Sequence, residues 1–288
     1  MTRFLLPVLG LLVFQSCAQK PWYGDLNFEG KFPSKLSEVS GMEVIDGEIW
    51  VIEDNGNKDI LYRVGPKANL IQQLKVKDAK NQDWEDLARD IDGNLYIGDF
   101  GNNANQRENL CIYKVPNPSK EKGDKIQAEA IRFSYPEQKK FPPKDKNLLF
   151  DCEAFFHHNG TLFLITKNRA HPYTGKALVY SIPDTPGKHK AKLIGEFASC
   201  TERDFCSITG AAISPSGEKV VLLGSGYIWL FTEFPEGNFT KGKMEQIDVL
   251  HRTQQESICF KDENTLLIAD EQSKTKGRNL YSYSLQKD

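Results

Sequence analysis

Polar side chains, six of them carboxylates, recur at ten matched positions along this 288-residue chain, and the carboxylates are the residues most able to do chemistry. Each matched pair opens and closes an apolar segment of about fifteen residues. The opening positions are Ser40, Glu85, Glu153, Thr209 and Glu256, and the closing positions are Asp54, Asp99, Lys167, Ser225 and Asp270. Gathering so many acids in one place is costly unless a cation or donor groups compensate. Hard oxygen ligands of this kind suit Ca²⁺ better than Zn²⁺.

Two other interpretations of these acids stay open at the level of sequence. Lys167 and Arg169 could pair with the acids internally, and the opening acids could instead accept hydrogen bonds from backbone N–H groups of neighbouring repeats. Residues that do not recur are better candidates for ligand contact than residues that do. We therefore expect Lys167, Arg169, Asn102 and Asn103 to bind a ligand.

The acids belong to a repeat that occurs five times, in residues 40–54, 85–99, 153–167, 209–225 and 256–270. Each copy is an apolar strand, a turn with Gly or Asn, and a second apolar strand, followed by a third strand with an apolar–aromatic pair. Four copies have a fourth strand, in residues 70–76, 126–133, 192–197 and 246–250. The last copy lacks one, and residues 26–32 are the spare strand that could complete it.

This pattern predicts an all-β fold, a β-propeller of four-stranded blades closed by its N-terminal strand. Five blades agree with about 53 residues per blade over residues 22–288, which we expect to form a single domain. Six blades would require a repeat that is not visible, and a β-sandwich would not explain the recurrence. In a propeller the first strand of each blade lines the central channel, so the opening and closing positions form a ring at one channel mouth.

Composition excludes several classes of protein. With 39% hydrophobic residues the chain can build a packed core, and its net charge of −2 argues against a nucleic-acid binder. We expect a monomer that binds a small-molecule or protein ligand.

The N-terminus has the pattern of an export signal. Arg3 precedes an apolar run over residues 4–14, which is too short to span a bilayer, and Cys17 follows it. The segment resembles a bacterial lipoprotein signal, with residues 1–16 as the signal peptide and residues 17–21 as a tether. Cys17 would then carry the lipid, including palmitate, and Ala18 favours the outer membrane. The alternative is an ordinary secretory signal, with Cys17 incidental. We expect no other contact with the membrane.

An exported chain meets an oxidising compartment, so its cysteines can pair. Cys200 and Cys206 lie close together in a polar segment, and we expect a small loop-closing disulfide between them, with two free thiols as the alternative.

Four short motifs resemble those of a known group. They are Asp83-Trp-Glu-Asp-Leu-Ala88, Gly98-Asp-Phe-Gly-Asn-Asn103, Asp151-Cys-Glu-Ala154 and Thr209-Gly-Ala-Ala212. The chain is similar to exported bacterial propellers of the SdiA-regulated and esterase-like phytase kinds. More distantly it resembles gluconolactonase and paraoxonase propellers, which hold Ca²⁺ in the channel mouth. This resemblance implies Ca²⁺ here, with ligands among Glu85, Glu153, Glu256, Asp99 and Asp270. Lys167 departs from that pattern, because it places a cation where a ligand is expected.

Three functions follow as hypotheses. The first is a lipid-anchored envelope propeller that binds a ligand or partner at its acidic channel mouth with Ca²⁺. The second is a metal-dependent hydrolase of the lactonase, phosphoesterase or glycosidase type, with Glu153 as general base. The third is a purely structural envelope protein, which would tolerate loss of the acids.

Overall fold

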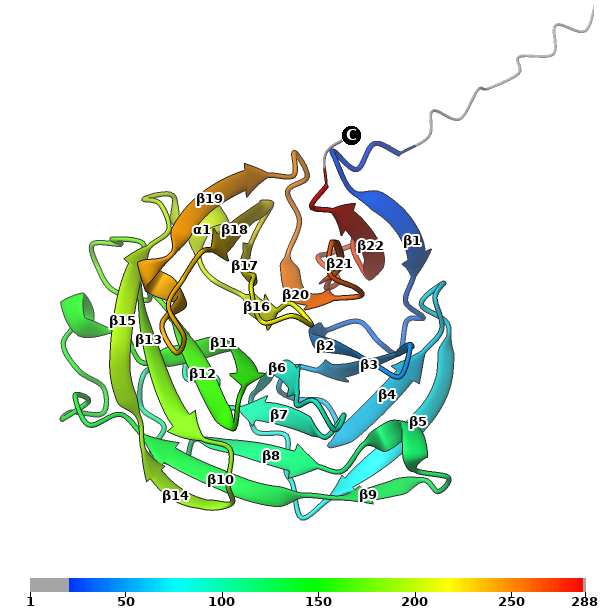
Figure 1. The fold of residues 1–288 in the computed structure, drawn as a ribbon, viewed down its shortest axis with the longest axis horizontal. Helices are drawn as coiled ribbons and strands as arrows, with labels where there is room; N and C mark the ends of the chain where they lie inside the picture. Colours follow the sequence, from blue (N-terminus) through cyan, green and yellow to red (C-terminus); the bar gives the residue numbers. More distant parts are fainter. Residues whose placement is uncertain (1–20, 287–288) are drawn as a thin grey trace, which may run out of the picture.

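Residues 21–286 are described by a computed structural model, and they form five antiparallel sheets arranged as a ring around one axis (Figure 1). The fold is a five-bladed β-propeller, as the repeat predicts. Cys17 and the expected signal peptide, residues 1–16, lie outside the described residues. Within 21–286, no helix has the length and apolar character needed to cross a membrane.

Each blade begins with its innermost strand and proceeds outward. Blade 1 contains β2 (Val39–Ile45), β3 (Glu48–Glu53), β4 (Ile60–Val64) and β5 (Leu70–Lys77). Blade 2 contains β6 (Trp84–Arg89), β7 (Leu95–Asp99), β8 (Cys111–Val115) and β10 (Glu129–Ser134). Blade 3 contains β11 (Asp151–His158), β12 (Thr161–Lys167), β13 (Lys176–Pro183) and β15 (Lys192–Ala198). Blade 4 contains β16 (Gly210–Ile213), β17 (Val220–Gly224), β18 (Tyr227–Thr232) and β19 (Lys243–Asp248).

Blade 5 is completed by the two ends of the chain. It contains β20 (Gln255–Phe260), β21 (Thr265–Asp270), β22 (Asn279–Ser284) and β1 (Asn27–Lys31). Strand β1 pairs antiparallel with β22 and lies at the outer edge of the blade (Figure 1). The prediction that residues 26–32 close the ring is therefore confirmed. This closure ties the first and last blades together.

The outer edges of blades 1 and 2 differ from the prediction. Residues 126–133 were expected to form one strand, but the chain divides at Ala128. Strand β9 (Lys125–Gln127) pairs parallel with β5 of blade 1, and only β10 completes blade 2. In the same way β14 (Gly187–Lys190) pairs parallel with β10 before the chain enters β15. An extended segment leaving one blade can add to the unpaired edge of its neighbour, so these strands join blades 1, 2 and 3.

Apolar clusters fill the spaces between blades. One cluster joins Trp50 of blade 1 to Trp84 of blade 2, and another joins Phe156 of blade 3 to Trp229 of blade 4. All three tryptophans are fully buried. Between residues 21 and 286, helical structure is limited to α1 (Arg203–Cys206) and the 3₁₀ turns η1 (Pro118–Lys120), η2 (Asp145–Asn147) and η3 (Phe239–Lys241).

Candidate functional site

The innermost strands of four blades carry a β-bulge at the same place. Pairing shifts register across Ser40, Glu85, Glu153 and Glu256, which are four of the five predicted opening positions. A bulge leaves its extra residue out of the ladder and turns the side chain to a new direction, a device common beside functional sites. The sequence repeat thus encodes a bulge, and the bulges place three glutamates at one end of the propeller axis.

Three carboxylates from blades 1 and 2 come close enough to share a cation. Asp54, Asp83 and Glu85 each offer an oxygen, and these atoms lie within 4.8 Å of one another. Asp54 follows strand β3, whereas Asp83 directly precedes β6. Asn55 holds two of the three acids in place, because its backbone N–H donates to Asp54 Oδ1 and its Nδ2 donates to Asp83 Oδ1 at 2.7 Å.

Glu85 is the member of this cluster that lacks a protein partner. Its side chain is nine-tenths buried, with 8% exposed, and it makes no hydrogen bond or ion pair within residues 21–286. Gly101 lies against it, and a Cβ on that glycine would collide with Glu85 Oε1 and Asp83 Oδ2. A buried carboxylate without donors is costly unless it is protonated or neutralised by a cation.

The acids of the ring raise one another's proton affinity. Burial raises the pKa of Asp54 to about 7, and repulsion from Asp83 and Glu153 adds to the shift. Burial also raises the pKa of Glu85 well above its ordinary value, again with repulsion from Glu153. Protons or a bound cation can relieve this repulsion, so the cluster has the electrostatics of a cation site.

Blade 3 supplies the ring with positive charge. Lys167 Nζ lies 3.1 Å from Glu153 Oε2, and Arg169 Nη2 lies 2.7 Å from Glu153 Oε1. Arg169 Nε also pairs with Asp151 Oδ2 at 2.5 Å. Burial alone would raise the pKa of Glu153, but Lys167 and Arg169 hold it below its ordinary value. Both oxygens of Glu153 therefore already have cationic partners.

The other predicted metal ligands lie in different surroundings. Asp270 is fully buried, and its two oxygens accept hydrogen bonds from Asn279 and Tyr281. Asp99 Oδ1 accepts from the N–H of Asp83 and pairs with Arg107 at 3.0 Å, whereas its Oδ2 is buried without a partner in the described chain. Glu256 is partly exposed, and burial raises its pKa to about 8 despite Lys167.

The predicted ligand-binding asparagines differ from each other. Asn102 is buried: its N–H donates to Asp151 Oδ1 at 2.6 Å and its Nδ2 donates to the Phe150 carbonyl, so it fastens its loop to blade 3. Asn103 is exposed, and its Oδ1 accepts from Arg169. Of the two, Asn103 is the one placed to meet a ligand.

Two hydroxyls of the predicted ring join neighbouring blades. Ser40 Oγ donates to the Trp84 carbonyl at 2.8 Å, and Thr209 Oγ1 donates to the Gln255 carbonyl at 2.7 Å. These two hydroxyls therefore have a structural role between blades, although they donate to carbonyls and are not acids that accept from N–H groups. The opening acids Glu85 and Glu256 make no hydrogen bond to a neighbouring blade within 21–286.

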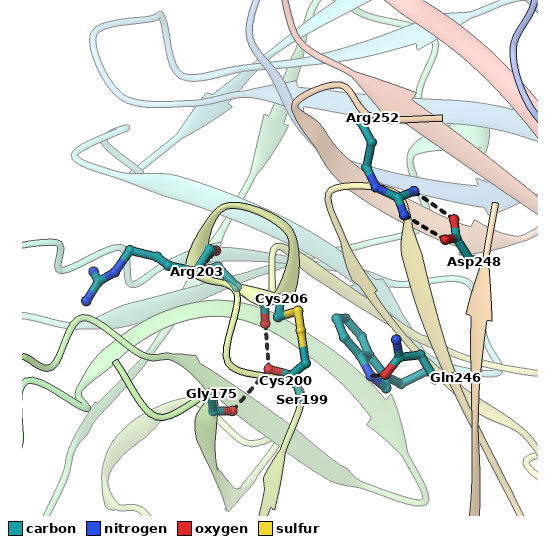
Figure 2. The surroundings of a disulfide bond; sticks show 10 residues. Gly175, Ser199, Cys200, Arg203, Cys206, Gln246, Asp248 and Arg252 are labelled. Atoms are coloured by element: carbon teal, nitrogen blue, oxygen red, sulfur yellow. Dashed lines mark hydrogen bonds and ion pairs between the residues drawn. A yellow bond between two sulfur atoms is a disulfide. The ribbon is translucent and has the colours of Figure 1, made fainter. Parts of the chain in front are cut away.

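The disulfide loop lies on the same face of the propeller. Cys200 and Cys206 form a disulfide across α1, and Ser199 Oγ donates to the carbonyls of Gly175 and Cys206, as Figure 2 shows. Between the cysteines, Phe205 lines a cavity of about 460 Å³ that reaches Glu271 near the acid ring.

The sequence repeat predicts Asp54 as a ring position, and Asp83 opens one of the four short motifs, but the predicted metal ligands include neither residue. The usable signal was the position of Asp83, two residues before the bulged Glu85 in the Asp-Trp-Glu-Asp motif. Sequence spacing does not pair Asp54 with Asp83, because Asp54 follows a strand of blade 1 and Asp83 precedes a strand of blade 2.

Comparisons with known proteins find only distant structural likenesses. No protein-family model matches the chain, and no curated protein matches it. Among solved structures, the PQQ-bound aldose sugar dehydrogenase from Streptomyces coelicolor is similar over 91% of this chain and 98% of that one, at 10% identity and TM-score 0.49. A gluconolactonase from Xanthomonas campestris is similar over 86% and 72%, at 13% identity and TM-score 0.46. A Bacteroides thetaiotaomicron protein of unknown function is similar over 91% and 73%, at 10% identity and TM-score 0.49. Likenesses this distant carry no argument about activity.

Proposed function

We propose that this chain is an envelope propeller that binds Ca²⁺ at the acidic channel mouth and uses the filled site to hold a polar ligand. Asp54, Asp83 and Glu85 would supply three of the six to eight oxygen ligands that Ca²⁺ takes. Neighbouring Arg169 and Asn103 would contact the ligand from blade 3 and its adjoining loop.

The observation that carries this proposal is the position of Glu85. Its carboxylate is buried beside two other acids and lacks a donor within the described residues, although the neighbouring Glu153 has two cationic partners. The nearby cations Lys167 and Arg169 thus neutralise Glu153 and leave the Asp54–Asp83–Glu85 cluster for an external cation.

The proposal includes the lipid anchor on Cys17 and outer-membrane location that the N-terminal sequence indicates. Strand β1 of the propeller begins at Asn27, ten residues after Cys17, so a lipidated protein would hold its propeller close to the membrane. Labelling cells with palmitate tests this part: we expect label on the wild-type chain and none on the Cys17→Ser variant. Equal labelling of both would contradict the anchor.

Calorimetric titration of Ca²⁺ into the full-length protein tests the metal site. We expect a single binding event that falls at least about tenfold in affinity in Glu85→Gln, because one carboxylate ligand is lost. Glu108→Gln is the matched control, because Glu108 is exposed in a loop of the same blade. This variant should bind Ca²⁺ as the wild type does. Absence of Ca²⁺ binding to the wild-type protein would overturn the proposal.

Gly101→Ala provides a test that leaves every charge unchanged. Gly101 does not adopt a positive φ, and the atoms nearest to an added Cβ belong to the carboxylates of Glu85 and Asp83. Displacing Glu85 and Asp83 should weaken Ca²⁺ binding while the melting temperature without Ca²⁺ stays close to that of the wild type. Unchanged affinity would place the metal elsewhere.

A hydrolase is the second candidate function, and Glu256 favours it. Glu256 has no hydrogen bond or ion pair within residues 21–286, faces the acid ring, and has a pKa raised to about 8 by burial. A carboxyl that titrates near neutral pH and is not needed as a metal ligand can serve as general acid or base. Glu153 suits that role less well, because its two cationic partners stabilise its charged form.

Screening lactones, phosphoesters and glycosides with Ca²⁺ present tests this candidate. If the protein hydrolyses one of them, we expect Glu256→Gln to lower kcat while Ca²⁺ affinity is kept. Activity unaffected by Glu256→Gln would exclude that residue as the base.

A further inference from the structure

The opposite mouth of the channel contains a second cavity, unrelated to the acid ring. Its volume is about 320 Å³, within the range of small-molecule sites. It is lined by the ends of the inner strands β6, β11 and β16, which surround the axis in Figure 1, and by the turns that follow them. Glu43 of β2 closes its fourth side.

The layer just above this cavity shows how the channel binds a carboxylate. Asp86 is fully buried on the axis, and its carboxylate accepts hydrogen bonds from three backbone N–H groups of three blades. Leu87 donates at 2.8 Å, Phe155 at 3.1 Å and Ala211 at 3.3 Å. These N–H groups are free to do so because the inner strand of each blade is a sheet edge that faces the channel.

The same three strands must present a second set of N–H groups to the cavity. Backbone groups alternate along a strand, so N–H groups two residues further on face the same way. Those groups belong to Arg89, His157 and Ile213, all of which line the cavity. The residues that follow Arg89 and Ile213 agree with this alternation. The N–H groups of Asp90 and Ser214 point into their own hairpins and donate to the carbonyls of Asn94 and Lys219.

Arg89 adds a positive charge to this second layer. Its Nε lies 3.2 Å from Glu43 Oε2, and its side chain keeps 28% of its surface exposed. Its two terminal nitrogens have no acceptor among the residues that the structure describes. The Nη1–Nη2 edge of a guanidinium matches the two oxygens of a carboxylate.

Among the titratable groups that line the cavity, Arg89 is the cation that remains available to a ligand. Asp90 is engaged by Asn94 and Tyr96, and His157 pairs with Asp184 at 3.0 Å. His158 is kept neutral near pH 7, because burial lowers its pKa. Glu43 Oε2 lies against the Nε side of Arg89, and burial raises the pKa of Glu43 to about 7. The charged form of Glu43 would repel a dianion more than a monoanion.

We propose that this cavity is a binding site for a small organic monocarboxylate, held by the Arg89 guanidinium and by the N–H groups of Arg89, His157 and Ile213. Apolar Ile91, Phe156 and Pro215 line the rest of the cavity and would receive the body of the molecule. The site is separated from the acid ring by Asp86, so it does not depend on the proposed Ca²⁺ function.

Amide chemical shifts of the full-length protein in detergent test this proposal directly. Titration with propionate should give a saturable downfield shift of the Arg89, His157 and Ile213 amide protons, with or without Ca²⁺. Propionamide, which is similar in shape but uncharged, should give no saturable shift. Absence of a saturable propionate shift at these three amides would overturn the proposal, as would phosphate binding at least as tightly as propionate.

Variants separate the guanidinium from the backbone. Arg89→Lys keeps a cation beside Glu43 but loses the paired nitrogens, and we expect propionate affinity to fall by about tenfold. The double variant Arg89→Gln/Glu43→Gln removes both charges together, leaves no buried ion unpaired, and should abolish the shift. Arg132→Lys, on the exposed face of β10, is the matched control and should bind as the wild type does. Wild-type affinity in both Arg89 variants would contradict the assignment.

Discussion

Asp86 and Phe155 are 69 positions apart in the chain, yet the Asp86 carboxylate accepts a hydrogen bond from the Phe155 N–H at 3.1 Å. The same oxygen also accepts from Ala211. One side chain of blade 2 therefore joins blades 2, 3 and 4 at the propeller axis. This arrangement is the structural alternative that the sequence left open for the repeated acids, but it occurs at Asp86 and not at Glu85.

Replacing Asp86 should destabilise the whole propeller. Asp86→Asn places an amide N–H₂ against buried N–H groups, so the free energy of unfolding should fall by about 2–4 kcal/mol. Chemical denaturation followed by tryptophan fluorescence measures this, because the buried tryptophans lie between blades. Asp92→Asn, in an exposed turn of the same blade, should change the free energy of unfolding little. Equal stability of the two variants would mean that the Asp86 bonds do not hold the blades.

Removing Lys167, one of the two cations that blade 3 places at the ring, should strengthen Ca²⁺ binding. Lys167→Met deletes a positive charge that lies 3.1 Å from Glu153, so the potential at the mouth becomes more negative. We expect Ca²⁺ affinity to rise by about two- to tenfold in calorimetry at low salt. Lys176→Met, at the exposed end of β13, provides the control. A loss of Ca²⁺ binding in Lys167→Met would show instead that Lys167 organises the site.

The protein without Ca²⁺ should lose stability as the pH rises. The pKa of Asp54 is raised to about 7 and that of Glu256 to about 8, mainly by burial, whereas both groups titrate near 4 when unfolded. Between about pH 4 and pH 8 the folded state thus binds more protons than the unfolded state, so the free energy of unfolding falls with rising pH.

Thermal melts measure this pH dependence. We expect a lower melting temperature at pH 8 than at pH 5.5, and Ca²⁺ should raise it more at pH 8, where the acids are deprotonated. Glu256→Gln should reduce the difference between the two pH values. A melting temperature that rises steadily with pH would contradict the assignment of raised pKa values to the ring.

The Cys200–Cys206 disulfide should stabilise its loop and the wall of the neighbouring cavity. In the chain-entropy model, closing so short a loop contributes roughly 2 kcal/mol. Cys200→Ser/Cys206→Ser should lose about this amount and become insensitive to dithiothreitol, whereas dithiothreitol should lower the melting temperature of the wild type. Cys111, Cys152 and Cys259 are buried free thiols, so they provide no competing partner near the surface. A response of the double variant to dithiothreitol would contradict this account.

The sequence by itself determined the architecture. Alternation along strands and the spacing of turns are local properties, and they recur five times in a way that only a ring of blades explains. Residues 26–32 could be assigned to the last blade because that blade lacked a strand. The pairing of the outer strands β9 and β14 could not be predicted from the sequence. Each can pair with the edge of either of two neighbouring blades, and which edge it joins depends on the distance between the blades.

The tertiary structure decided which acids meet. Asp54 and Asp83 belong to different blades, and only the packing of blade 1 against blade 2 brings them together with Glu85. Glu153 has the same place in the repeat as Glu85, yet Lys167 and Arg169 pair with it. The repeat gives four of the five blades the same bulge, at Ser40, Glu85, Glu153 and Glu256. The charged groups around each bulged glutamate come from neighbouring strands, blades and loops. Their positions depend on how the ring closes.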